Sequence, residues 1–162
     1  MVIKAFKPFV NSDSETLILG SFPSVKSRQE NFFYGNNQNR FWKIISEILG
    51  DSFPQNVEEK KAFLIKHKIA LWDIVSECEI EGSLDANIKN PHICDLTQVF
   101  KVAAIKKIII NGATAKKFFK KAYPLLDKIT FYLPSTSPAN VKFDFKAWEK
   151  AIKADFIVAN DF

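Results

Sequence analysis

Lys107-Ile108-Ile109-Ile110-Asn111-Gly112 is the clearest strand signal in the chain. A short, continuous apolar run that ends at a glycine is too short for a helix and is typical of a strand buried on both faces. Three further runs have the same character, at residues 16–19, 69–72 and 129–133, and they are followed by Gly20, Asp73 and Pro134. The sequence therefore predicts four buried strands.

Helical periodicity separates these strands. Apolar residues recur at helical spacing over residues 40–50, and helices are also predicted at residues 56–66, 95–103, 113–123 and 144–154. Strands that alternate with helices imply right-handed crossovers and a mainly parallel sheet covered on both faces. We expect an α/β protein with one domain over residues 1–162, a three-layer α/β/α sandwich around a central, mainly parallel, four-stranded sheet. Residues 77–90 are expected to form a polar loop.

Composition narrows the class of protein. The chain has 162 residues, 47% hydrophobic and 25% charged, which matches one soluble globular domain rather than a disordered, fibrous or membrane chain. Two cysteines, Cys78 and Cys94, are too few for a four-thiolate zinc or iron–sulfur site, and no histidine shows ligand spacing beside them. We therefore expect no metal and no other cofactor. The N-terminus lacks an apolar signal segment and no stretch approaches ~20 apolar residues, so we expect no membrane association and a cytoplasmic, reducing location.

Charge is unevenly distributed along the chain. Residues 1–100 hold 11 basic and 13 acidic side chains, whereas residues 101–162 hold 12 basic and 5 acidic ones, within a net charge of +5. A basic C-terminal part favours a polyanionic partner such as nucleic acid, and it serves solubility equally well. The lysines at 116, 117, 120 and 121 fit a solvated helix face better than a DNA track.

The loops that follow the strands are the place to look for function, because ligands of open parallel sheets bind beyond the carboxyl ends of the strands. Four loops fall there, at residues 20–39, 73–90, 111–114 and 134–141, and their side chains are mostly neutral and polar. The chain has no dinucleotide-binding glycine motif, Walker motif, serine-hydrolase elbow or zinc-protease helix, so those chemistries lose ground. Neutral groups position a ligand or a water rather than supply strong acid–base catalysis.

Four groups of motifs follow one another in these loops. The first is Gly20-Ser21-Phe22-Pro23-Ser24, then Ser27, then Phe33-Tyr34-Gly35-x-x-Gln38-Asn39-Arg40-Phe41-Trp42. The later ones are Ala70-Leu71-Trp72-Asp73-Ile74-Val75 with Gly82-Ser83-Leu84-Asp85, then Ile110-Asn111-Gly112-Ala113, and then Leu133-Pro134-Ser135-Thr136-Ser137-Pro138-Ala139. This ordered set, which spans about residues 16 to 141, resembles the motifs of the uracil-DNA glycosylase superfamily, with the last group matching its DNA-clamping loop, and it is most similar to the hypoxanthine-DNA glycosylase (deoxyinosine glycosylase) branch.

The resemblance implies a monofunctional DNA glycosylase that hydrolyses the N-glycosidic bond of deaminated bases, hypoxanthine first and uracil or xanthine next, and leaves an abasic site. Many relatives have Asp or Asn where this chain has Phe22, but Phe is usual in the hypoxanthine branch, whose catalytic side chain corresponds to Asn39. Asn36-Asn37 stand where that branch often has His-Pro, a departure that concerns loop shape and substrate preference more than reaction type. The implied partner is DNA that contains deaminated bases, bound by a monomer.

The resemblance and the residue types together suggest roles for the site residues. We expect Asn39 to hold the attacking water with its carbonyl oxygen and to contact sugar or base with its NH2 group. An ionised Asp73 would accept the ring N–H of hypoxanthine or uracil and disfavour adenine, and an aromatic side chain would stack on the base. The expected substrate-binding residues are Ser21, Phe22, Phe33, Tyr34, Asp73 and Asn111. The expected DNA-binding residues are Ser24, Ser27, Ser83, Ser135, Ser137 and Asn140, with Asn140 or Val141 entering the space that the base vacates.

Several of these residues also have an ordinary structural interpretation. Asn39 is placed to cap the helix that follows it, and Asp73 is as well suited to a turn as to reading a base. Asn111 and Gly112 fit a tight strand-to-helix turn, while Phe41 and Trp42 fit the core. At the level of the whole chain, a non-catalytic nucleic-acid-binding module on the same scaffold and a hydrolase of free nucleosides are the alternatives.

Overall fold

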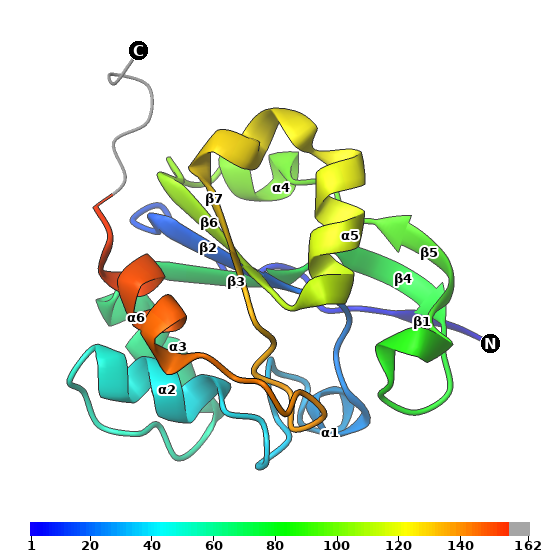
Figure 1. Ribbon diagram of the computed structural model, residues 1–162, viewed down its shortest axis with the longest axis horizontal. Helices are drawn as coiled ribbons and strands as arrows, with labels where there is room; N and C mark the ends of the chain where they lie inside the picture. Colours follow the sequence, from blue (N-terminus) through cyan, green and yellow to red (C-terminus); the bar gives the residue numbers. More distant parts are fainter. Residues whose placement is uncertain (156–162) are drawn as a thin grey trace.

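A central parallel sheet organises the protein, whose computed structural model describes residues 1–155 (Figure 1). The sheet has the order β3-β2-β6-β7, and each neighbouring pair is parallel. Its strands are β2 (Thr16–Gly20), β3 (Ile69–Asp73), β6 (Lys107–Asn111) and β7 (Thr130–Leu133). All four predicted strands are therefore confirmed, together with their parallel arrangement.

Helices cover the two faces of the sheet, as predicted for a three-layer sandwich (Figure 1). On one side lie α2 (Phe41–Ile48), α3 (Val57–Lys66) and α6 (Phe145–Lys153), and on the other side lie α4 (Thr97–Phe100) and α5 (Ala113–Ala122). Side chains define where two of them begin. The Asn56 side chain accepts a hydrogen bond from the backbone N–H of Glu59, and that of Asp144 accepts one from Ala147.

The prediction of a polar loop at residues 77–90 was wrong at both ends. The strands β4 (Val75–Glu79) and β5 (Lys89–Ile93) take up the first three and last two of these residues, and they join β1 (Val2–Lys4) in an antiparallel sheet of order β1-β4-β5. Charged side chains conceal this sheet in the sequence, because β5 is largely exposed and only two residues of β4 are buried. The short elements α1 (Val25–Glu30), η1 (Asp85–Asn87) and η2 (Pro124–Ile129) were also unpredicted, and the helix expected at residues 95–103 is only α4.

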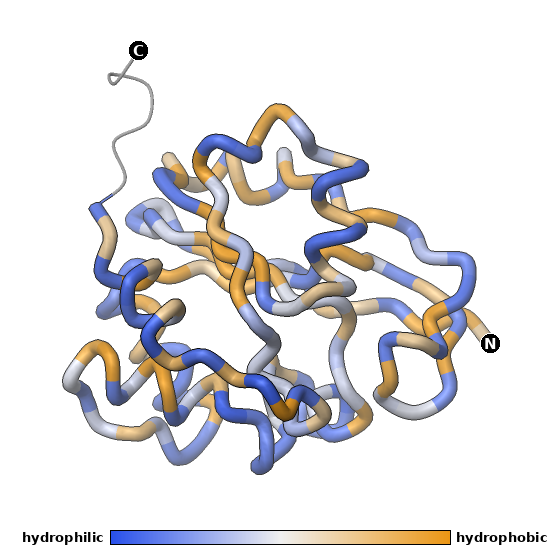
Figure 2. The backbone as a smooth tube through the Cα atoms, in the orientation of Figure 1, coloured by the Kyte–Doolittle hydropathy of each residue, from blue (hydrophilic) through white to orange (hydrophobic). Residues whose placement is uncertain are grey.

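Apolar residues concentrate in the strands and on the inner sides of the helices (Figure 2). Phe41 and Trp42 are buried, as predicted, and their rings meet edge to face with centroids 5.0 Å apart. Cys78 and Cys94 are free and buried. Within residues 1–155, no cluster of His, Cys, Asp or Glu side chains is arranged to hold a metal ion, and no helix has the length and apolar character needed to cross a membrane.

One buried cation fixes α6 against the sheet. Lys107, at the start of β6, is 6% exposed, and its Nζ donates hydrogen bonds to the carbonyl oxygens of Ala151, Ile152 and Ala154 at 2.7–2.8 Å. These carbonyls lie at the end of α6, where the helix lacks its own donors and its dipole is negative. Burial lowers the pKa of the Lys107 ammonium. The interaction matters for the site described below, because α6 carries Trp148 against one of its loops.

We expect Lys107→Met to lower the free energy of unfolding by about 2 kcal/mol or more, because three carbonyls lose a charged donor. Lys106→Met is the matched control. Lys106 has 60% of its side chain exposed and pairs only with Glu15, so its loss should change stability by less than about 0.5 kcal/mol. Urea unfolding of both variants measures the difference, and equal effects would contradict this account of α6.

Candidate active site

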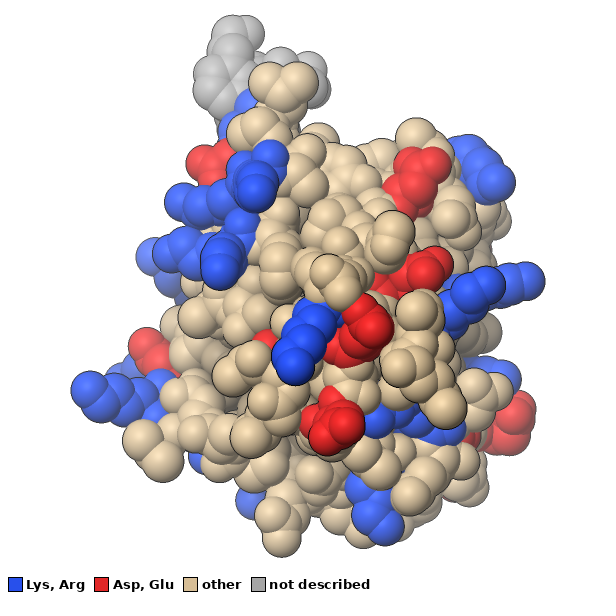
Figure 3. Space-filling view, turned by 90° about the vertical axis from the view of Figure 1, so that its right-hand side faces the viewer, with Lys and Arg blue, Asp and Glu red and all other residues tan. Residues whose placement is uncertain are grey.

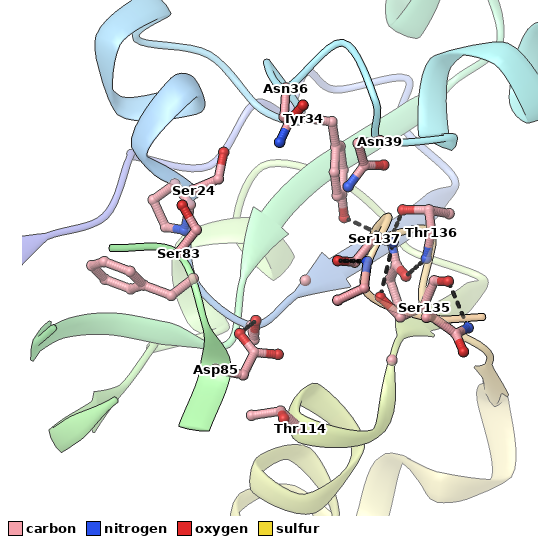
Figure 4. A pocket seen from close by; sticks show the side chains of 18 of the residues that line it. Ser24, Tyr34, Asn36, Asn39, Ser83, Asp85, Thr114, Ser135, Thr136 and Ser137 are labelled. Atoms are coloured by element: carbon pink, nitrogen blue, oxygen red, sulfur yellow. Dashed lines mark hydrogen bonds between the residues drawn. The ribbon is translucent and has the colours of Figure 1, made fainter. Parts of the chain in front are cut away.

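The four loops predicted to carry function converge on one cavity of about 460 Å³ (Figure 4). It lies beyond the carboxyl ends of the central strands, where Gly20, Asp73, Asn111 and Pro134 line it. Its lining includes every predicted site residue except the wedge candidate Val141: Asn39, Ser21, Phe22, Phe33, Tyr34, Asp73, Asn111, Ser24, Ser27, Ser83, Ser135, Ser137 and Asn140. The predicted residues thus share one cavity, and the contacts below distinguish side chains that face the cavity from those that brace it.

The two ends of the Asn39 amide group have different surroundings: the oxygen contacts the start of a helix and the nitrogen faces the cavity. Its Oδ1 accepts the backbone N–H of Phe41, the first residue of α2, at 2.9 Å. Asn39 is not the N-cap residue itself, which is Arg40, but it does accept an N–H at the start of the helix, so its carbonyl oxygen is not the free group that was expected to hold water. Its Nδ2 makes no hydrogen bond with residues 1–155. Figure 4 shows the side chain beside Tyr34, facing the loop that carries Thr136, so the NH2 group is the part of Asn39 available to a ligand.

Asp73 is a buried carboxyl group without a hydrogen-bond partner. It is the last residue of β3 and is 4% exposed, and its Oδ2 is the one buried side-chain polar atom in residues 1–155 that makes no hydrogen bond. Burial and the nearby charge of Asp85 raise its pKa to about 7. Because buried polar atoms are normally satisfied within the protein, this carboxyl group indicates a ligand-binding position.

Close packing around Gly20 holds Asp73 and Tyr34 together. A Cβ atom on Gly20 would lie 2.7 Å from Asp73 Oδ1 and 3.0 Å from the Tyr34 hydroxyl, so any larger residue would displace the Asp73 carboxyl group. Tyr34 has a backbone φ of 54°, in the left-handed region that a bulky residue rarely adopts. Its ring stacks on Phe41, with centroids 4.0 Å apart, and burial raises the pKa of its hydroxyl.

Asn111 and Phe33, both predicted to contact the substrate, make their contacts within the protein instead. Asn111 donates from Nδ2 to Thr136 and to the Tyr34 hydroxyl, and its Oδ1 accepts the backbone N–H of Thr136. Its amide is therefore used to join β6 to the loop after β7. Phe33 packs its ring edge to face against Phe6 and Phe32, which places that ring in the aromatic core. Of the two aromatic residues expected to stack on a base, Tyr34 is the better placed.

The serines fall into two groups. Ser27 is 2% exposed and accepts the backbone N–H of Gly35, so it braces the turn at Tyr34, and Ser24 caps α1 through the same network. The hydroxyl groups of Ser83, Ser135 and Ser137 each accept one backbone N–H and keep their own proton to donate. These three serines suit a phosphate, whereas Ser27 does not.

Arginine and tryptophan side chains that the sequence did not single out position the loop at residues 134–140. Arg40 donates from its guanidinium to the carbonyl oxygens of Ser137 and Asn140, both at 3.0 Å. Trp148 of α6 donates from Nε1 to the carbonyl oxygen of Pro134 at 2.8 Å. Arg40 directly follows Asn39 at the start of α2. The segment that positions the Asn39 amide group therefore also holds the loop at residues 134–140. The one signal in the sequence was the place of Arg40 inside the first motif, directly after Asn39.

The cavity contains acidic groups and lacks cations. Ser21 donates a 2.7 Å hydrogen bond to Asp85 of η1, which keeps this second carboxylate at the rim (Figure 4). Among the described residues, no Lys, Arg or His lines the cavity. Charges of both signs share the face shown in Figure 3, and the four lysines of α5 are exposed as a solvated helix face would be. The net basic charge alone therefore does not mark a DNA track.

Comparison with known proteins agrees with this architecture. The family model described as the Uracil DNA glycosylase superfamily matches residues 7–156. The chain belongs to this superfamily. It is 34% identical over 148 residues to a hypoxanthine DNA glycosylase of Methanosarcina acetivorans, covering 88% of this chain and 91% of the relative. It is 29% identical over 158 residues to a hypoxanthine DNA glycosylase of Methanosarcina barkeri, covering 93% of this chain and 98% of that relative.

A solved structure extends the likeness to the fold. The solution NMR structure of a candidate uracil DNA glycosylase from Methanosarcina acetivorans superposes with a TM-score of 0.79 at 30% identity, covering 94% of this chain and 98% of that one. The superfamily glycosylase fold, a three-layer sandwich, is thus supported by sequence and by structure.

The buried Asp73 should reduce stability at neutral pH. Folding raises the pKa of this carboxyl group from 3.8 to about 7, so the folded state binds the proton more tightly and stability falls as pH rises from about 4 to 7. We expect Asp73→Asn, which has no charge to bury, to be more stable than wild type by up to about 4 kcal/mol at pH 8. The difference should shrink towards pH 4. Denaturant unfolding across this range checks it, and a variant less stable than wild type at pH 8 would contradict it.

Proposed function

We propose that the protein is a monofunctional DNA glycosylase that hydrolyses the N-glycosidic bond of hypoxanthine, and also of uracil or xanthine, in DNA and leaves an abasic site. The observation that carries this proposal is the pairing, in one cavity, of the unpartnered Asp73 carboxyl group with the cavity-facing NH2 group of Asn39. The Asp73 carboxyl group suits the hydrogen-bonding edge of a base, and the Asn39 NH2 group suits the sugar or the departing base. The relatives named hypoxanthine DNA glycosylase support the same substrate class.

The reaction requires stabilisation of the charges that develop in the transition state rather than a strong nucleophile. Bond cleavage builds positive charge on the sugar and negative charge on the leaving base, and water attacks the sugar. The Asn39 NH2 group can donate to the oxygen or nitrogen atoms at this bond. Helix α5 begins at the same cavity, with Ala113 and Thr114 in the lining, no side-chain cap at Gly112 and no acidic residue in its first turn. Its positive end therefore favours the negative charge that develops on the base.

Base extrusion accounts for the remaining features of the cavity. A base must leave the duplex to reach Asp73, and stacking on the free face of Tyr34 would offset part of the cost. The hydroxyl groups of Ser83, Ser135 and Ser137 are placed to hold phosphates on either side. Asn140 is engaged at both ends, donating to Ser135 and accepting from Lys142, whereas the neighbouring Val141 is 88% exposed. We assign the wedge to Val141 rather than to Asn140.

Excision of single lesions from a synthetic duplex tests the activity. Duplexes with one hypoxanthine or one uracil should yield alkali-labile abasic sites, while undamaged duplexes stay intact. We expect Asn39→Ala to lower the single-turnover rate by at least about 100-fold, the usual size of the loss of one donor to developing charge. Asn39→Ala also removes the acceptor for the Phe41 N–H at the start of α2, at a cost of about 1 kcal/mol.

Asn39→Ser separates these two effects. A serine hydroxyl can still accept the Phe41 N–H at the start of α2 but supplies no NH2 group, so this variant should keep its stability and lose excision as Asn39→Ala does. Glu47→Gln, at an exposed position of α2 outside the cavity lining, is the neutral control. Normal excision by Asn39→Ser would remove Asn39 from catalysis. Salt-dependent DNA binding without any excision would favour the binding module, and equal turnover of free inosine would favour the nucleoside hydrolase.

The wedge assignment predicts a difference between duplex and single strand. We expect Val141→Gly to slow excision from a duplex by about tenfold or more, because the space left by the base is no longer filled, and to leave a single-stranded substrate nearly unaffected. Leu125→Gly is the matched control, since Leu125 is as exposed, at 87%, but belongs to η2 and not to the loop that lines the cavity up to Asn140. Equal slowing on both substrates would contradict the wedge.

A further inference from the structure

We propose that Asp73 recognises the base as a neutral carboxylic acid, which donates its O–H to the base carbonyl oxygen and accepts the adjacent ring N–H. This inference rests on the proposed glycosylase function and goes beyond it by assigning the chemical state of the group that reads the base. It also replaces the sequence-based expectation that Asp73 acts as an ionised carboxylate. No proton is transferred, because recognition uses two hydrogen bonds.

The first argument is that no side chain of residues 1–155 donates a hydrogen bond to Asp73 Oδ2 and none of the described residues that line the cavity carries a positive charge. The Oδ2 atom is itself buried. An ionised carboxylate normally needs donors or a cation when it is removed from water. A neutral carboxylic acid at this position needs no cation, and a ligand that offers one acceptor and one donor would satisfy its hydrogen bonds.

The second argument comes from the titratable groups around Asp73, which lie on three other segments. Tyr34 follows α1, Cys94 follows β5, and Asp85 belongs to η1. Burial raises the pKa of the Tyr34 hydroxyl, and it raises that of the Cys94 thiol to about 12, so both stay neutral near pH 7. Asp85 is exposed, and its negative charge opposes a second negative charge on Asp73.

The third argument is the fit to deaminated bases. Hypoxanthine presents a ring N–H beside a carbonyl oxygen, and uracil does the same. A neutral carboxyl group matches both atoms, whereas an ionised one accepts the N–H and repels the carbonyl oxygen. An ionised Asp73 would also oppose the negative charge that develops on the leaving base. The neutral form fits the N–H and ring nitrogen of adenine equally well, so discrimination against adenine falls on the cost of extruding a paired base.

The pH dependence of single-turnover excision tests this inference with the intact protein at saturating enzyme. The acid form of Asp73 is the competent one, so the rate should be highest below pH 7 and fall about tenfold per pH unit above the midpoint. The midpoint should be the same for hypoxanthine and uracil duplexes, because it belongs to the protein. A rate that rises from pH 6 to pH 8 would overturn the inference.

Two variants sharpen the test. Asp73→Asn presents a donor and an acceptor at every pH, so it should stay within about tenfold of the best wild-type rate and lose the decline above pH 7. Asp85→Asn removes the opposing charge, eases ionisation of Asp73 and should move the midpoint to lower pH. If Asp73→Asn unfolds like wild type but excises at least 100-fold more slowly than wild type at pH 6, the ionised form is the reader and the inference fails.

The outcomes also separate this inference from the proposed function. If wild type excises neither hypoxanthine nor uracil at any pH, the glycosylase proposal itself is overturned, and the assignment of Asp73 is overturned with it. If wild type excises and its rate rises with pH, the glycosylase proposal stands and only the neutral-acid assignment is overturned.

Discussion

The absence of a side chain at Gly20 is the constraint on which the site depends. Parallel pairing of β2 with β3 places Gly20 opposite Asp73, so two strand ends meet at the floor of the cavity. A Cβ atom on Gly20 would collide with the Asp73 carboxyl group and press on the Tyr34 hydroxyl. Because that space is left open, a carboxyl group without protein partners and a tyrosine with a strained backbone can share one corner. The register of β2 and β3 therefore determines which groups meet at the floor of the cavity.

Rigid connections hold the rest of the cavity around this corner. The start of α2 supplies both the Asn39 amide and the Arg40 guanidinium, and Arg40 binds the backbone of the loop at residues 137–140. Trp148 holds the beginning of the same loop, and α6 is in turn held by Lys107. Groups that act on a small reacting centre need such support, because catalysis depends on placement to a fraction of an ångström. This arrangement lowers the stability of the fold, because Asp73 is buried and its Oδ2 makes no hydrogen bond with residues 1–155.

Much of this was predictable from the sequence, and the failures have physical causes. The buried strands and amphipathic helices have strong periodicity, so their order and the location of the site followed from it. The antiparallel sheet did not, because β4 and β5 combine exposed charges with bulges that disturb alternation. The roles of Ser27, Phe33 and Asn111 depend on which way each side chain points, and spacing along the chain does not specify that. Asp85 was quoted in a motif, but its effect on Asp73 requires their proximity in space.

The central claim is that an everted deaminated base occupies the cavity between Tyr34 and Asp73. The most direct measurement is a crystal structure of the protein bound to a duplex with one 2′-fluoro-deoxyinosine, whose fluorine slows cleavage by opposing positive charge on the sugar. The account predicts the base outside the helix, stacked on Tyr34, with its N–H and carbonyl edge on Asp73 and the Asn39 NH2 group at the sugar. A base still stacked within the duplex, with the cavity turned away from the DNA, would contradict it.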